Sequence, residues 1–236
     1  MKRRLFLGTL LTTTAGTRLA AAADQSFAYG ESHVFTAFRN GLQIGHHALR
    51  FHEEGGQRHV STSIDLAVHL LGMSVYRFTY RCHEIWSGDT FQALTADTDN
   101  DGKRYTVRAN RTAEGIAVAH EGARPVVKAS GAMEPVARDA SGRDILPDAT
   151  LPTTHWNILQ VRANTLLHTE YGTLYKVAVA RGPRENIRTA TGALAATRYD
   201  YTGELQFTQW FDVRNRWVKA IFNAPDGSPI EYILQE

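Results

Sequence analysis

The last forty residues constrain the fold most strongly, because four runs of alternating side chains follow one another there. The runs cover residues 194–201, 205–213, 217–223 and 229–234. Gly or Asn at each intervening bend supplies the positive φ that tight hairpins need. Period-two alternation of aromatic and β-branched residues between such turns predicts an antiparallel meander. A meander has one face to bury, so we expect the rest of the chain to curl around it.

The first strong hairpin signal lies near the start of the chain, at Asn40-Gly41 between two alternating runs. Asn-Gly in this setting favours a two-residue loop. Such a loop would place Phe35 opposite His46 on the paired strand. Gly45, inside the second run, would let another backbone or a ligand come close.

Further strands are expected at residues 63–70, 74–87, 91–97, 104–110, 116–120, 125–128, 174–180 and 184–190. Residues 129–152 lose the periodicity and are predicted to form a long surface loop. One short helix is predicted at residues 155–167, after an N-cap at Thr153-Thr154. About a dozen antiparallel strands with one helix indicate an all-β fold, a meander curling into a barrel-like or strongly curved sheet.

The first residues resemble a twin-arginine export signal. Arg3-Arg4 precedes a mildly apolar run, and an alanine tract then offers a cleavage site just before Asp24 or one residue earlier. The apolar run is far shorter than the roughly 20 residues of a membrane span. We therefore expect a cleaved signal peptide at residues 1–23 and one periplasmic or secreted domain at residues 24–236, without a stable membrane span. The general secretory route remains the alternative to the twin-arginine route.

Removal of the leader reverses the sign of the net charge. The leader carries four basic residues and no acid, so basic residues fall from 26 to 22 against 24 acids, a net charge of −2. No basic block remains that would indicate a nucleic-acid partner. The single cysteine, Cys82, excludes an internal disulfide and is interpreted as a small core residue.

Several short motifs resemble a family of exported bacterial proteins catalogued as domain of unknown function 6134. The motifs are Asn40-Gly41-Leu42-Gln43-Ile44-Gly45, Glu84-Ile85-Trp86-Ser87-Gly88, Trp210-Phe211-Asp212, Trp217-Val218-Lys219 and Asp226-Gly227-Ser228. The resemblance spans most of the chain after the leader and implies a β-rich periplasmic domain. It carries no established activity, so it assigns no role to any residue.

Glu84 is the sharpest candidate for chemistry, because alternation places it on the same strand face as Tyr80 and Trp86. A carboxylate among aromatic rings is desolvated, which raises its pKa and suits it to general acid or base catalysis. His155 or Asp212 would be its catalytic partner. The alternative is structural, with Glu84 accepting hydrogen bonds from a buried Arg, Tyr or Trp.

An acidic segment reproduces the first half of a calcium-binding loop. Asp97, Asp99 and Asp101 occupy positions one, three and five, and Gly102 occupies position six. Position twelve is Arg108, where a bidentate acid is required, and the flanks are expected to be strands rather than helices. We interpret the segment as an acidic β-turn.

Ten histidines raise the question of a metal site. His46 and His47 are adjacent on a strand, so they point to opposite faces and cannot share one ion. A site built from His83, His155 and His168 would have to be assembled by folding alone. Dispersed, hydrogen-bonded histidines are the preferred interpretation, and we expect neither a metal nor another cofactor.

Two functional hypotheses follow. The first is a non-catalytic periplasmic barrel that binds a small apolar, amphipathic or sugar-like molecule, with Tyr80, Trp86, Trp156 and Trp210 as candidate ligand-binding residues. The second is a secreted acid–base enzyme, a lyase or hydrolase acting on carbohydrate or lipid through Glu84. A His or Asp within hydrogen-bond reach of Glu84 would favour the enzyme.

Overall fold

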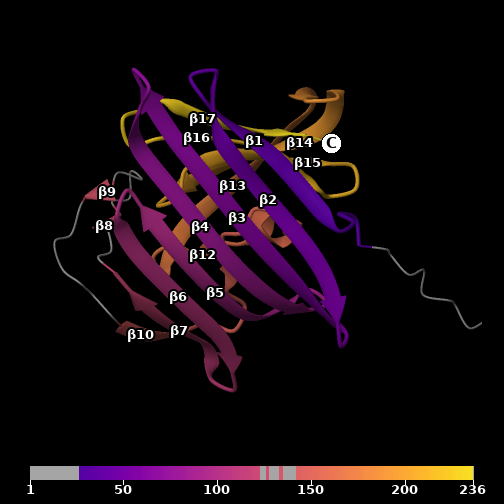
Figure 1. Cartoon of the computed structure of the whole chain (residues 1–236). Helices are drawn as coiled ribbons and strands as arrows, with labels where there is room; N and C mark the ends of the chain where they lie inside the picture. The colour runs from indigo at the N-terminus through magenta and orange to yellow at the C-terminus, as the bar shows by residue number, and fades with distance from the viewer. Residues whose placement is uncertain (1–26, 123–125, 128–132, 135–141, 236) are drawn as a thin grey trace, which may run out of the picture.

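The structure, a computed structural model, describes residues 27–122, 126–127, 133–134 and 142–235. The predicted signal peptide lies outside these residues. Strands dominate (Figure 1), and they are β1 (Ser32–Arg39), β2 (Leu42–Glu54), β3 (Gln57–Leu70), β4 (Met73–Ser87), β5 (Thr90–Asn100), β6 (Lys103–Thr112), β7 (Gly115–Glu121), β8 (Val126–Val127), β9 (Met133–Glu134), β10 (Gly142–Leu146), β11 (Leu151–Pro152), β12 (Thr165–His168), β13 (Thr173–Thr189), β14 (Gly192–Gly203), β15 (Phe207–Asp212), β16 (Trp217–Asn223) and β17 (Pro229–Leu234). A 3-10 helix, η1 (Ile158–Arg162), accompanies them. None of the described helices has the length and apolarity that a membrane crossing requires.

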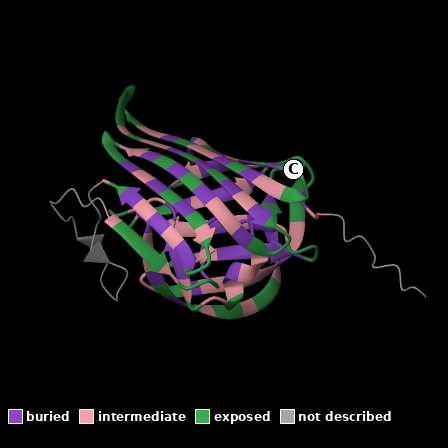
Figure 2. Cartoon of the chain, turned by 90° about the horizontal axis from the view of Figure 1, so that it is seen from below, coloured by how far each residue is buried: buried purple, intermediate pink, exposed green. Residues whose placement is uncertain are grey.

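Fifteen strands form one sheet in the order β10-β7-β6-β5-β4-β3-β2-β1-β17-β16-β15-β14-β13-β12-β11. The first and last strands pair with each other in the middle of this sheet. Its two outermost strands, β10 and β11, are joined by residues 147–150 alone. A link of that length keeps the two edges within roughly 18 Å of each other. The sheet therefore curls back on itself, as Figure 2 shows, and the predicted barrel-like all-β fold is confirmed.

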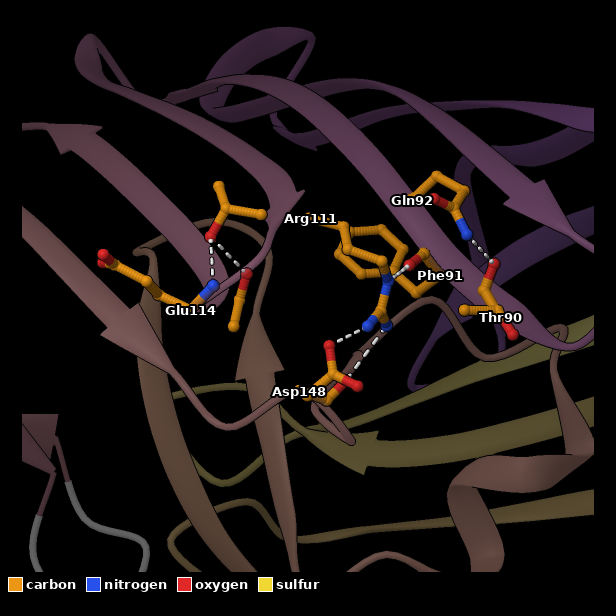
Figure 3. A network of polar contacts seen from close by, with 8 residues as sticks. Thr90, Phe91, Gln92, Arg111, Glu114 and Asp148 are labelled. Carbon is orange, nitrogen blue, oxygen red and sulfur yellow. Dashed lines mark hydrogen bonds and ion pairs between the residues drawn. The ribbon is translucent and has the colours of Figure 1, made fainter.

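Arg111 on β6 fastens the link between the two edges (Figure 3). Its Nε donates to the carbonyl oxygen of Phe91 at 2.7 Å, and one terminal nitrogen donates to the carbonyl oxygen of Asp148 at 3.0 Å. The guanidinium also forms an ion pair with the Asp148 carboxylate. One side chain thus ties β5 and β6 to the connection between β10 and β11.

The predicted C-terminal meander is confirmed. The strands β14, β15, β16 and β17 pair consecutively and antiparallel. The acidic β-turn is also confirmed, because β5 and β6 form a hairpin around Asp101-Gly102. In that turn Asp99 Oδ1 accepts the Gly102 N–H at 2.7 Å.

The register predicted for the first hairpin is wrong by one residue. Arg39 lies opposite Leu42, but a bulge at Ile44, opposite the step from Ala37 to Phe38, shifts the pairing, so Phe35 lies opposite His47 instead of His46. His47 consequently faces the interior. Gly45 does allow a close backbone approach, as predicted: a Cβ there would lie 1.9 Å from the carbonyl oxygen of Asp65.

Two further predictions need correction. The helix expected at residues 155–167 is only the 3-10 turn η1, and the following residues 165–168 form β12, which pairs with β13. The loop expected at residues 129–152 contains β10, paired with β7, and β11. The predicted strands at 174–180 and 184–190 are one bulged strand, β13.

Alternation on β4 places its side chains as predicted. Tyr80, Cys82, Glu84 and Trp86 are buried, while Arg81 and the other residues between them face outward or are partly exposed. Figure 2 shows alternating buried and more exposed positions along strands of the sheet. Cys82 is a buried free thiol, in agreement with its interpretation as a core residue.

Candidate functional site

The inside of the curled sheet is occupied by the chain itself. We call residues 147–172 the interior segment, which comprises β11, η1, β12 and their connections. Its Trp156 ring lies 5.2 Å from Trp86 and 5.8 Å from Phe51, between ring centroids. Farther along, Thr169 Oγ1 accepts a hydrogen bond from the Tyr80 hydroxyl at 2.7 Å. The candidate site is therefore formed between the sheet wall and this segment.

Glu84 lies where the wall meets the interior segment and is 0% exposed. Trp86 Nε1 donates to its carboxylate at 2.9 Å, and Trp156 Nε1 lies 3.3 Å from both carboxylate oxygens. Burial raises the pKa of Glu84 to about 8, against the opposing effect of these donors. The Thr154 hydroxyl also opposes the rise, although it makes no hydrogen bond of normal geometry. At neutral pH Glu84 is thus mainly a neutral acid that joins two indoles.

The structure does not bring either predicted catalytic partner to Glu84. Asp212 accepts the backbone N–H groups of Arg214 and Arg216, each at 2.9 Å, and the Arg216 side chain at 2.8 Å. It is the acceptor that closes the β15–β16 turn. His155 donates through Nδ1 to Gln209 Oε1 at 3.3 Å. The hydrogen-bond partners of Glu84 among the described residues are the two indoles.

Two of the four predicted ligand-binding residues lie together, Trp86 and Trp156, whose ring centroids are 5.2 Å apart. Tyr80 is buried on the same face of β4 but farther along it, where its hydroxyl donates to Thr169. Trp210 does not belong with them. Its Nε1 donates to Glu185 at 2.5 Å, and the Lys219 ammonium lies 5.3 Å from its ring. Its neighbours on adjacent strands, Arg198 and Lys219, mark it as part of the outer face of the meander.

A group of histidines that sequence reasoning did not assemble also lies in the interior. We call His33 on β1, His47 on β2 and His155 on the interior segment the histidine group. All three surround Trp217: His33 Nε2 donates to the Trp217 carbonyl at 2.6 Å, His47 lies 5.0 Å from the ring, and His155 stacks on it at 4.9 Å. Phe35 and Tyr232 close the enclosure around His47.

His47 is the member of this group whose ring nitrogens lack hydrogen-bond partners. Its side chain is 1% exposed, and neither ring nitrogen has a hydrogen-bond partner among the described residues. Burial, followed by the neighbouring His155 and His33, lowers the pKa of His47 well below its ordinary value. The ring is therefore neutral and offers one donor and one acceptor to whatever approaches it.

His155 has an unusual backbone, with φ of +58°. Non-glycine residues in this region are uncommon, and outliers concentrate at functional sites. Burial lowers the pKa of His155 to about 4. Because Nδ1 donates to Gln209, Nε2 of the neutral ring is an acceptor. His155 is partly exposed, and its ring centroid lies 6.2 Å from that of the buried His47.

The metal site considered from His83, His155 and His168 is not assembled. His83 lies on the outer face, with its Nε2 3.1 Å from His59 Nδ1 and its Nδ1 3.2 Å from Ser61 Oγ. His168 stacks on Tyr171 in the interior. Within the described part of the chain, no group of three or more His, Cys, Asp or Glu side chains is placed to hold a metal ion.

Two grooves lie on the outer surface, away from Glu84. One, of about 570 Å³, runs between the β13–β14 hairpin and β1 and β17, beside Phe38, Ile187 and Ile233. The other, of about 390 Å³, crosses β2 to β5 beside Arg81 and His83. Neither is lined by Glu84 or by any of the candidate catalytic and ligand-binding residues.

Fold and interior together define a β-barrel-like domain in which the interior segment packs against the inner face of the sheet. The sequence belongs to the family described as Domain of unknown function (DUF6134), whose model matches residues 35–235. No curated protein matches the chain. Among solved structures it is similar to a β-barrel-like protein of domain of unknown function DUF1849 from Brucella abortus, with 10% sequence identity and a TM-score of 0.57. That match covers 87% of this chain and 95% of the other, and it shows the fold alone.

Proposed function

We propose that this protein is an exported, periplasmic β-barrel-like domain that binds an amphipathic small molecule at the histidine group. The observation that carries the proposal is His47, a buried imidazole with two unpartnered nitrogens inside an aromatic enclosure. A buried polar group without a partner costs roughly 1–3 kcal/mol. A ligand that supplies the missing hydrogen bonds recovers this cost.

The chemistry of the enclosure limits the ligand. Phe35, Trp217 and Tyr232 pack around His47 and make its surroundings apolar, which suits a ligand with an apolar part. His47 and His155 are neutral, so they favour an uncharged hydroxyl or carbonyl group over an ion, whose burial without a counter-charge is costly. An alkyl glycoside has both parts and is a suitable first probe. The sugar part of this probe also represents the sugar-like ligands that the sequence analysis predicts.

The test uses the purified mature protein with octyl glucoside below its micellar concentration. At a hundredfold excess over Kd, binding stabilises the protein by about 2.7 kcal/mol, which is a rise in melting temperature of roughly 5–10 °C. Glucose lacks the tail and octanoate carries a charge, so neither should match this rise. His47→Phe should abolish the response. Equal responses to octyl glucoside in both proteins would contradict the proposed site.

The acid–base enzyme is the less supported alternative. Glu84 is fully buried, and its hydrogen-bond donors among the described residues are core indoles rather than a histidine or a second carboxyl. Desolvation of Glu84 between the sheet wall and the interior segment is enough to explain its raised pKa, without a catalytic role. Glu84→Gln should therefore leave octyl glucoside binding unchanged.

A further inference from the structure

The hairpin between β3 and β4 projects beyond the sheet at one end of the molecule (Figure 1). Pairing of β3 with β2 ends at Leu66, and pairing of β4 with β5 ends at Phe78. We call residues 68–76 the projecting hairpin. Inside it only the two strands pair with each other, as far as Leu70 opposite Met73. It is a narrow ribbon whose end is free of the rest of the fold.

The end of this ribbon is apolar. Leu70, Leu71, Met73 and Val75, which we call the apolar tip, are 61%, 91%, 66% and 50% exposed. They occupy the last cross-strand pair, the turn and the adjoining bulge. Single exposed apolar residues are ordinary, but four within six positions at a hairpin end are not.

Leu71 stands in a turn position that disfavours it. Its φ is +51°, and Gly72 follows at +81°. Three other turns among the described residues have the same two-residue geometry with the usual residues, at Asn40-Gly41, Gly55-Gly56 and Asp101-Gly102. Asn, Asp and Gly suit this left-handed region, whereas leucine is strained in it. The geometry of the turn therefore does not explain why a leucine occupies position 71.

We propose that the apolar tip inserts end-on into the acyl layer of a lipid bilayer. A stable protein interface takes about 20–30 residues from each partner, far more than this ribbon presents. The base of the hairpin carries exposed Arg77 beside Asp101, whose N–H donates to the Arg77 carbonyl at 2.8 Å. With both signs of charge at the base, insertion depends on apolar contact and not on anionic headgroups. This surface is independent of the interior ligand site.

The test is flotation of the purified mature protein with phosphatidylcholine vesicles, with Leu71→Asn as the variant. Asn suits the turn, so the melting temperature should stay level or rise, while the partition coefficient falls roughly tenfold or more. Val213→Asn is the matched control, because Val213 is 68% exposed in a different turn. It should partition like the wild type. Wild-type partition should also persist in high salt, where a charge-driven contact would weaken.

Three results would overturn the proposal. One is wild-type protein that stays at the bottom of the gradient. Another is Leu71→Asn that floats as well as the wild type. The third is a wild type that is dimeric by light scattering and becomes monomeric in Leu71→Asn without any vesicle effect, which would make the apolar tip a contact between copies.

Discussion

Glu84→Gln should remove a pH dependence of stability that Glu84 imposes on the folded protein. The pKa of the carboxyl is about 8 in the folded state and 4.5 as its ordinary value. Between these values the native state holds a proton that the unfolded state has released. The free energy of unfolding therefore falls as pH rises through this window, by about 1.4 kcal/mol per unit.

The interior histidines act in the opposite direction. The pKa values of His47, His155 and His168 are lowered from 6.5, the last two to about 4 and about 3, so their contribution grows as pH rises through 6.5 and levels off about one unit above it. Glu84→Gln retains these histidines, so the difference between the two proteins isolates the effect of Glu84. Between pH 6.5 and 8 the wild type should lose roughly 2 kcal/mol relative to the variant.

The glutamine variant should lack the fall with pH and keep only the small rise from the histidines in the same window. Its amide oxygen can accept one indole N–H, but its NH₂ cannot accept the other, which costs roughly 1 kcal/mol at pH 6.5. The two stability curves should therefore cross before pH 8. Urea unfolding followed by tryptophan fluorescence measures both, since Trp86 and Trp156 contact the site.

The matched control is Glu185→Gln, which alters a partly exposed carboxyl that also accepts an indole N–H, from Trp210. This variant retains Glu84 and should retain the wild-type slope. Parallel curves for the wild type and Glu84→Gln between pH 6.5 and 8 would refute the assignment of the slope to Glu84.

Three other predictions test separate parts of the account. Gly45→Ala should destabilise by roughly 2–4 kcal/mol in urea, because its Cβ would meet the Asp65 carbonyl at 1.9 Å; Gly56→Ala, with φ of +76° but open space, should cost only roughly 1 kcal/mol, and equal losses would contradict the close approach. His47→Phe should stabilise the ligand-free protein by roughly 1–3 kcal/mol in the same assay by removing two unpartnered nitrogens; a loss would show that those nitrogens are satisfied. Replacing Arg3 and Arg4 with lysine should retain precursor in the cytoplasm by fractionation and immunoblotting, and unchanged export would argue against the twin-arginine route.

Period-two alternation predicted the parts of the fold that depend on local sequence. It located β14 to β17 and assigned Glu84 and Trp86 to the buried face of β4, because both follow from residues a few positions apart. It could not predict the bulge at Ile44, since one inserted residue leaves the alternation on either side intact. That single residue turned His47, not His46, toward the interior.

The remaining misses come from long-range packing. β10, with sequence Gly-Arg-Asp-Ile-Leu, is largely exposed and pairs only with β7, so it carries little periodicity. Residues 155–167 favoured a helix locally, but burial of Trp156 against Trp86 and pairing of β12 with β13 prevail over that preference. The histidine group comes from β1, β2 and the interior segment, and the spacing of these residues in the sequence does not predict that they lie together.

The most direct test of the interior binding site is nitrogen NMR of the histidine imidazoles during titration with octyl glucoside. His47→Phe and His155→Gln identify the two signals that matter. The proposed site predicts that the His47 and His155 ring nitrogens shift with a common saturation, while those of His59 and His83 on the outer face stay in place. Shifts confined to the outer-face histidines, or none at saturating probe, would contradict a ligand site at the histidine group.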